Sequence, residues 1–158
     1  FRMDGAVPEV VVNQTGDSLV DFRVESDNNA HMLFVDGGND KVGIDTSSPG
    51  SGLHVKSSFA TAITAKSSNY TATASDHTIL LDCSGGNVTI TLPTAVGASG
   101  RMYIVKRVDG SANAGNINTS GSEQIDGLSS ASVAGLGSIV LQSDNSNWWK
   151  VAEYINPP

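Results

Sequence analysis

The residues best suited to nucleophilic chemistry are an adjacent acid and imidazole, Asp76 and His77, in a chain with many serines. A Ser-His-Asp triad needs a serine held in a strained, exposed turn and a histidine oriented by a third group. The sequence contains no Gly-x-Ser-x-Gly turn, a common source of that strain. In a chain this rich in Ser and Asp, such neighbours arise by coincidence. The sequence therefore predicts no catalytic triad and no enzyme.

Paired carboxylates are a second source of chemistry, because many enzymes that cleave glycosidic bonds use two of them. Such a pair needs one acid kept neutral by burial beside a second, ionised acid. Glu is scarce in this sequence, and most Asp residues stand beside Gly, Asn or Ser, where they bond to turn backbone. A chain of 158 residues also scarcely builds a long polysaccharide groove. A carbohydrate-cleaving enzyme is therefore not the favoured interpretation.

Two groups of residues could hold a metal ion. The segment 36–40 (Asp-Gly-Gly-Asn-Asp) has oxygen ligands but lacks the spacing and terminal Glu of a calcium-binding loop, so a turn between strands explains it. In a parallel trimer, His31 or His54 would occur three times around the axis, where the imidazoles could hold a transition metal or an anion. We favour ordinary hydrogen-bonded histidines, and we predict no metal and no cofactor.

Adjacent tryptophans and amide-rich loops point to the binding of sugars. Trp148 and Trp149 must face opposite sides of a strand, so one is expected in the core and the other on the surface. An exposed aromatic ring can stack on the apolar side of a sugar, while Asn and Asp in nearby loops bind its hydroxyl groups. The candidate ligand-binding residues are Tyr70, Asp109, Asn113, Asn116, Asn145, Asn147 and Trp149.

The charge balance excludes several classes of partner. The formal net charge is −7, and the nine basic residues are scattered rather than clustered. We therefore expect no nucleic-acid partner, and an anionic membrane surface is an equally poor one. No apolar run approaches the length of a transmembrane helix, so no membrane insertion is expected.

Cys83 is the only cysteine, which excludes a disulfide within the chain. Because Cys83 lies two residues after Leu81 in an alternating run, it is predicted to be a small core residue.

The composition predicts an all-β fold with little or no helix. Hydrophobic residues make up 39% of the chain and aromatic residues only 6%, while Gly alone occurs 17 times. Such a composition suits many short strands joined by tight turns. No segment has a sustained period of 3.6 residues, and even the most helix-like window, 60–67, alternates by twos.

We expect a first part, 1–56, to form a shaft or collar of short strands. In the run 32–35 both faces of a strand would be apolar, and such a strand needs cover on both sides. Because so few residues cannot supply that cover, we predict that strands from three copies of the chain interleave. The residues predicted for the trimer core are Met32, Leu33, Phe34, Val35, Val42, Ile44, Leu53 and Val55.

The second part, 57–158, is expected to form a compact head, an antiparallel β-sandwich or barrel-like domain. Strands 78–82 and 88–92 flank a Ser-Gly-Gly-Asn turn and are predicted to form a hairpin. Residues 101–108 form the next predicted strand, and 109–121 is expected to be a loop. A closing hairpin is predicted from strands 138–142 and 148–154.

Several motifs follow one another along the chain. The first part contains Asp21-Phe22-Arg23-Val24-Glu25-Ser26-Asp27, Leu33-Phe34-Val35-Asp36, Lys41-Val42-Gly43-Ile44-Asp45-Thr46-Ser47-Ser48-Pro49 and Leu53-His54-Val55. The second part contains Asp76-His77-Thr78-Ile79-Leu80-Leu81-Asp82, Val88-Thr89-Ile90-Thr91-Leu92-Pro93, Gly100-Arg101-Met102-Tyr103-Ile104-Val105-Lys106, Ile125-Asp126-Gly127 and Ser143-Asp144-Asn145-Ser146-Asn147-Trp148. The first set resembles a module of bacteriophage tail fibres, especially those of marine phages. The second resembles the small β domain at or near the C-terminus of such fibres.

The resemblance implies a function and a set of partners. It implies a non-catalytic fibre segment that assembles as a homotrimer, joins other fibre or baseplate proteins of the virion, and contacts host-surface glycans. Such a protein would be made in the bacterial cytoplasm. A capsid-attached head fibre or decoration protein is an alternative of the same structural class, and a fragment of a carbohydrate-cleaving tail spike is a less favoured one. One position departs from the module, because Asp45 stands where a second glycine is usual, and Asp tolerates a positive φ better than most residues.

Overall fold

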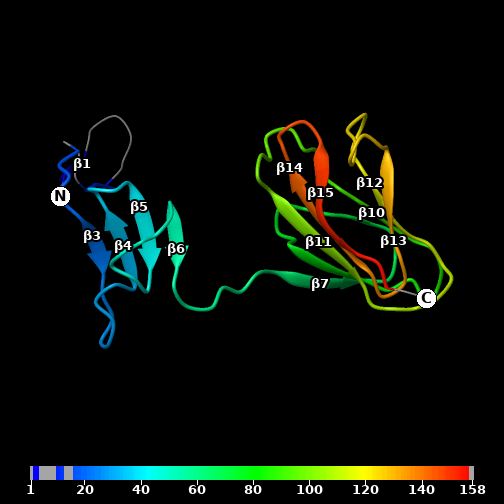
Figure 1. The fold of residues 1–158 in the computed structure, drawn as a ribbon, viewed down its shortest axis with the longest axis horizontal. Helices are drawn as coiled ribbons and strands as arrows, with labels where there is room; N and C mark the ends of the chain where they lie inside the picture. The colour runs from blue at the N-terminus through cyan, green and yellow to red at the C-terminus, as the bar shows by residue number, and fades with distance from the viewer. Residues whose placement is uncertain (1, 4–9, 13–15, 157–158) are drawn as a thin grey trace. The chain divides into compact units, whose positions relative to one another are not determined.

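The computed structural model describes residues 2–3, 10–12 and 16–156, and these residues form β-strands without any helix (Figure 1). The chain divides into two compact units, unit 1 at residues 1–60 and unit 2 at residues 61–158. The boundary expected from the sequence lay after Lys56. Within the described residues no sheet closes into a barrel.

Unit 1 is built on a small four-stranded sheet. Its strands are β3 (Phe22–Val24), β4 (Leu33–Asp36), β5 (Lys41–Ile44) and β6 (Leu53–Val55). They are arranged in that order, with antiparallel pairs up to β5 and a parallel pair between β5 and β6. A separate two-stranded ribbon joins β1 (Arg2–Met3) to β2 (Val10–Val11). The short strands expected in the first part of the chain are therefore present, and β4 covers most of the apolar run 32–35.

The two faces of the unit 1 sheet differ sharply in composition. Strand register and alternation place a group of apolar side chains on one face: Phe22, Val24, Leu33, Val35, Val42, Ile44, Leu53 and Val55. The opposite face carries Arg23, Phe34, Gly43 and His54. Every residue predicted for the trimer core, apart from Met32 and Phe34, therefore lies on the apolar face.

Phe34 was predicted to pack against other chains in the trimer core, but the structure buries it within its own chain. Its side chain is only 7% exposed within a single chain, and its ring makes an edge contact with His31 at 5.5 Å between centroids. Its burial therefore needs no second copy. The apolar side chains that do stay exposed belong to the other face, where Phe22, Val24 and Leu53 are 39%, 44% and 62% exposed.

The turn after β5 explains why Asp45 can replace a glycine. Asp45 has a φ of 62°, so the position does require left-handed backbone. Its carboxylate accepts a hydrogen bond from the Asn29 side chain, which anchors the turn to the segment before β4. Gly43 is needed for a different reason, because a Cβ there would lie 2.5 Å from the Thr46 carbonyl oxygen and 2.9 Å from Thr46 Cγ2.

Gly43→Ala is expected to destabilise unit 1 by about 1–3 kcal/mol, because the added methyl meets backbone that the turn holds in place. Gly50→Ala is the matched control, since a Cβ at Gly50 meets nothing within 4 Å. Urea unfolding of the two variants measures the difference. Equal stability of both variants would show that the turn after β5 yields without cost.

Unit 2 contains a five-stranded sheet in the order β15-β14-β11-β9-β7. Its strands are β7 (Ile63–Lys66), β9 (Thr78–Leu81), β11 (Met102–Arg107), β14 (Ser138–Ser143) and β15 (Trp148–Tyr154). The β7–β9 and β9–β11 pairs are parallel, and the β11–β14 and β14–β15 pairs are antiparallel. The predicted closing hairpin is confirmed, and it carries a register shift between Val140 and Leu141.

A second sheet of unit 2 has the order β13-β12-β10-β8. Its strands are β8 (Tyr70–Thr71), β10 (Val88–Thr91), β12 (Gly115–Asn118) and β13 (Ser130–Val133). The β8–β10 and β10–β12 pairs are parallel, and only β12 and β13 are antiparallel. Both sheets are therefore mixed, which corrects the prediction of an antiparallel head.

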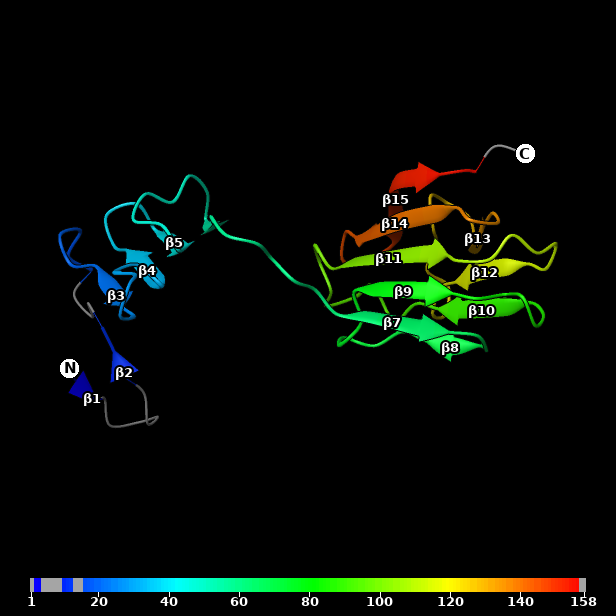
Figure 2. The same ribbon diagram turned by 90° about the horizontal axis from the view of Figure 1, so that it is seen from below.

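The predicted hairpin of strands 78–82 and 88–92 is wrong. Its two strands, β9 and β10, belong to different sheets, so the chain crosses from one sheet to the other at residues 82–87 (Figure 2). The expectation of a loop over 109–121 is also wrong, because β12 lies within it. Each strand is buried on alternate residues, which shows that alternation indicates burial but does not identify the pairing partner.

One hydrophobic core joins the two sheets of unit 2. Ile79, Tyr103 and Leu141 enter it from the five-stranded sheet, and Ile90 and Ile117 enter it from the four-stranded sheet. Cys83 is completely buried beside them, as expected for a small core residue. Trp148 is also completely buried and packs against Tyr103 at 5.4 Å between ring centroids. Trp149 is 47% exposed, so the two tryptophans do separate.

Candidate glycan-binding site

The outer face of the four-stranded sheet is polar throughout. Strand register places two rows of small polar side chains across β10, β12 and β13, facing away from the core: Thr89, Asn116 and Ser132 in one row, and Thr91, Asn118 and Ser130 in the other. The alternate residues of these strands are the core side chains. A sheet with this alternation has one dry face and one that stays in water. The polar face can therefore meet a hydrated ligand without disturbing the core.

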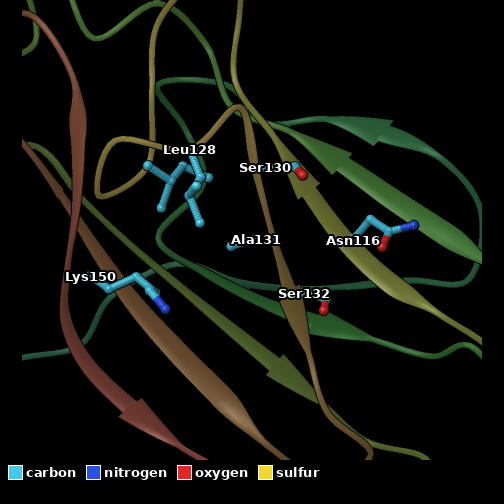
Figure 3. Close-up of a pocket in the computed structure, with 7 residues that line it drawn as sticks. Asn116, Leu128, Ser130, Ala131, Ser132 and Lys150 are labelled. Atoms are coloured by element: carbon cyan, nitrogen blue, oxygen red, sulfur yellow. The ribbon is translucent and has the colours of Figure 1, made fainter.

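A hollow of about 420 Å³ lies along the edge strand β13 (Figure 3). Its lining residues are Asn116, Ile125, Leu128, Ser130, Ala131, Ser132 and Lys150. In Figure 3, Asn116, Ser130 and Ser132 lie on one side of β13, while Leu128, Ala131 and Lys150 lie on the other. An occupant of this hollow would contact hydroxyl and amide groups at one end and aliphatic carbon at the other.

The polar groups of the hollow are available to a ligand. Among the residues that the structure describes, the side chains of Asn116, Ser130 and Ser132 make no hydrogen bond to the protein. The Asn116 amide can donate and accept hydrogen bonds, and each serine hydroxyl can also donate or accept one. A hydroxyl-rich ligand such as a sugar presents the complementary groups, and its apolar ring face suits Leu128 and Ala131.

Lys150 supplies the only positive charge among the lining residues of the hollow, and that charge is already balanced. Its ammonium group lies 3.0 Å from a Glu153 carboxylate oxygen and 3.9 Å from one of Asp126. The Lys150 backbone N–H also donates to Asp126 Oδ1, which fixes the loop before β13 to β15. With its charge neutralised, the hollow suits a neutral sugar better than a strongly acidic one.

Asp109 and Asn113 have structural roles instead of the ligand-binding roles predicted for them. Asp109 accepts from Arg107 Nε at 3.1 Å and Nη2 at 2.9 Å, and the Cys83 N–H donates to it at 2.7 Å. The Arg107 guanidinium holds the pKa of Asp109 well below its usual range, and the N–H groups of Cys83 and Ser111 add to this. Asn113 donates to the Cys83 carbonyl at 2.7 Å.

The loop between β14 and β15 also uses its polar residues internally. Asn145 accepts from the Gly97 N–H at 2.7 Å and has a φ of 81°. Asn147 accepts from the Gln124 N–H at 2.9 Å. The Trp149 indole donates to Asp144 Oδ2 at 2.7 Å, which fixes the exposed ring beside this loop. Trp149 thus keeps an open face, while Asn145 and Asn147 serve the fold.

Tyr70, Asp76 and Thr73 form a hydrogen-bonded cluster. Tyr70 was a candidate ligand-binding residue, and Asp76 was considered as the acid of a catalytic triad. Asp76 accepts from the Tyr70 hydroxyl at 2.9 Å and from the Thr73 N–H and hydroxyl at 2.8 and 2.9 Å. Burial acts to raise the pKa of Asp76, but these bonds outweigh it and the pKa is lowered. His77 contacts Thr78 Oγ1 at 3.2 Å instead. None of these hydrogen bonds links Asp76 to His77, as a triad would require.

The histidines suggested for an axial ring have local partners. The His31 backbone N–H donates to Asn29 Oδ1, and the His31 ring makes an edge contact with Phe34. His54 Nδ1 accepts from the Gly50 N–H at 3.2 Å, and His54 lies on the face opposite the apolar one. Within the described part of the chain, no three His, Cys, Asp or Glu side chains come together as a metal site.

Of the candidate ligand residues, the structure places only Asn116 in the hollow. Ser130, Ser132 and Lys150 were not predicted from the sequence, because ligand-binding groups were expected mainly in loops. A signal for two of them was present, because Ser130-Ala131-Ser132-Val133 alternates polar with small apolar residues, as an edge strand with a wet face does. No local signal brings Lys150 to this strand, since its position depends on how the two sheets meet.

Comparison with protein-family models, curated proteins and solved structures finds no match to this chain in any of the three. The described residues include no helix of the length and hydrophobicity needed to cross a membrane.

Proposed function

We propose that this chain is a structural and adhesive segment of a bacteriophage tail fibre. In this proposal it assembles as a homotrimer on the virion, beside other fibre or baseplate proteins, and binds host-surface glycans without cleaving them. Unit 1 is the shaft or collar and unit 2 is a β-sandwich head. The order of the sequence motifs supports the assignment to fibres. The main observation in support of a trimer is the uncovered apolar face of unit 1.

That face is too apolar to remain in water. Its three exposed members, Phe22, Val24 and Leu53, lie beside half-buried residues of the same kind. Phe22 and Val35 also line an apolar hollow of about 530 Å³. Contiguous apolar surface of this sort marks an interface in soluble proteins. Since strands this short seldom hold together alone, association with identical units is the simplest way to cover the face.

The hollow beside β13 supports the adhesive part of the proposal. It combines free amide and hydroxyl groups with aliphatic side chains, and its charge is balanced. One such site would bind weakly. Three sites on each fibre, and several fibres on each particle, would raise the effective concentration and hence the avidity.

A glycan array probed with the purified wild-type assembly tests this proposal, and we expect a restricted set of glycans to bind. Asn116→Ala should weaken binding of those glycans about fivefold to tenfold per site, because the amide would lose its bonds to sugar hydroxyls. Asn118→Ala is the matched control. It lies two positions along the same strand and face but does not line the hollow.

Three outcomes would count against the proposal in different ways. Equal losses in both variants would move the site away from the hollow. Absence of any bound glycan on the array would remove the adhesive role. Release of reducing ends from a host polysaccharide would instead support a carbohydrate-cleaving spike.

A further inference from the structure

The five-stranded sheet of unit 2 is apolar on its outer face as well as on its inner face. Strand register aligns the outward side chains in rows that cross all five strands. One row contains Ile63, Thr78, Ile104, Val140 and Ala152, and another contains Ala65, Leu80, Lys106, Ser138 and Tyr154. Met102, Gln142 and Trp149 continue the face at one end. The four-stranded sheet carries only Thr, Asn and Ser at the equivalent positions, so the two outer faces of the head are opposite in character.

This outer face is exposed in the single chain. Ile63 is 65% exposed, Tyr154 is 53% exposed, and Val151, at the register shift of β15, is 51% exposed. A sheet with apolar side chains on both faces usually has a covering layer on each side. Within the part of unit 2 that the structure describes, the core covers the inner face and no layer covers the outer one.

The charges on this face favour a second copy of the chain as its cover. None of its outward positions within the described strands carries a carboxylate, although the chain has a net charge of −7. Copies with this charge repel one another, so they can approach only through a face free of acids. Both outer faces of the head lack acids on their strands, but only this one is apolar and gains free energy by being covered. Its one charged side chain, Lys106, already donates to the Leu136 carbonyl and lies 5.9 Å from the Tyr154 ring centroid.

The size of the face limits the area that it can contribute to a trimer. With strands about 4.8 Å apart and residues about 3.3 Å apart, a five-stranded face of this length measures roughly 400 Å² in projection. Three such faces turned toward one axis total roughly 1,200 Å², shared among three pairwise contacts, which is less than a specific interface usually buries for each pair. The apolar face of unit 1 must therefore supply the rest of the buried area.

We propose that the outer face of the five-stranded sheet, centred on Ile104 and Val140, is the contact surface between head units around a three-fold axis. This inference rests on the proposed homotrimer and specifies which surface forms it. It also places the polar face of β10, β12 and β13 away from the axis. The hollow at Asn116 then opens outward in all three copies.

Spin labels on full-length chains test the orientation of the heads. Gln142→Cys places a label on the apolar outer face, and Thr89→Cys places one on the polar outer face. The native Cys83 is fully buried and should stay unlabelled in the folded protein. The label-to-label distance between copies is expected to be shorter at residue 142 than at residue 89. A shorter distance at residue 89 would overturn the proposed face.

A charge variant provides the second arm of the test. Ile104→Lys would bury an unpaired charge in the interface, and we expect the apparent dissociation constant of the trimer to rise more than about tenfold. Thr89→Lys, on the polar face, should leave the trimer intact. Light scattering gives the assembly state, and fluorescence of the buried Trp148 reports folding. If Ile104→Lys does not fold, the spin-label distances decide the question.

The outcomes separate this inference from the function on which it rests. A wild-type chain that stays monomeric contradicts the homotrimer itself. A wild-type trimer in which folded Ile104→Lys still assembles normally contradicts only the face proposed here.

Discussion

Replacing Asp109 with alanine is expected to lower the free energy of unfolding by about 3–5 kcal/mol, because it leaves the buried Arg107 guanidinium without the carboxylate that balances its charge. The side chains of Arg107 and Asp109 are only 4% and 10% exposed, and two hydrogen bonds join them. The same carboxylate accepts the Cys83 N–H, so the change also leaves a backbone donor in the core edge unpaired. Urea unfolding of wild type and variant measures the loss.

Asp82→Ala is the control for this variant, since Asp82 caps the exposed Ser84 N–H in the same loop region. It should cost much less. A loss in Asp109→Ala no larger than in Asp82→Ala would show that the Arg107 pair does not brace the head.

The same ion pair gives stability a pH dependence with a definite sign. Because the pKa of Asp109 is lower in the folded protein than in the unfolded chain, the folded state releases this proton more readily. The resulting stability is fully present above about pH 4, the ordinary range for Asp, and is lost as pH falls toward the lowered folded pKa. The stability gap between wild type and Asp109→Asn should therefore narrow below about pH 4.

Phe34→Ala is expected to cost about 3–5 kcal/mol in unit 1, because it opens a cavity where the ring is packed within its own chain. The apolar face of the same sheet would lose its support, so assembly should weaken as a consequence. Unit 2 should keep its β spectrum, since it has a separate core. A thermal melt at equal protein concentration measures the effect.

Met32→Ala serves as the comparison for Phe34→Ala. Met32 lies just before β4 and is 47% exposed, so its truncation should change stability by about 0.5 kcal/mol or less. Equal melting temperatures for wild type and Phe34→Ala would mean that the ring contributes little packing energy.

Side-chain burial could be predicted from the sequence wherever alternation was clean. Val88, Ile90 and Leu92 alternate with two threonines in the sequence, and all three are buried. Alternation shows which residues lie on the same face of a strand, and this does not depend on which strand it pairs with. The small residues and turn signals likewise indicated an all-β chain correctly.

Strand pairing in the head could not be predicted in the same way. The segment Ser84-Gly85-Gly86-Asn87 is a strong turn signal, but the same turn serves a hairpin within one sheet and a crossing between two. The choice was decided by distant partners: β9 pairs with β7 and β11, while β10 pairs with β8 and β12. A local motif carries no information about these neighbours.

The candidate site was only partly predictable for a related reason. Asn and Asp in loops indicate polar surface, but they also hydrogen-bond backbone, and Asp109, Asn113, Asn145 and Asn147 do so. Separating free side chains from those that brace loops requires the geometry. The free ones, such as Ser132, stand on a strand whose partners come from elsewhere in the chain.

The mass of the full-length chain in solution, measured by light scattering across a range of micromolar concentrations, tests the central claim most directly. The account predicts three times the chain mass, maintained on dilution, because the apolar faces of unit 1 and of the five-stranded sheet are covered only by other copies. A stable monomer over the same range would contradict the fibre assignment.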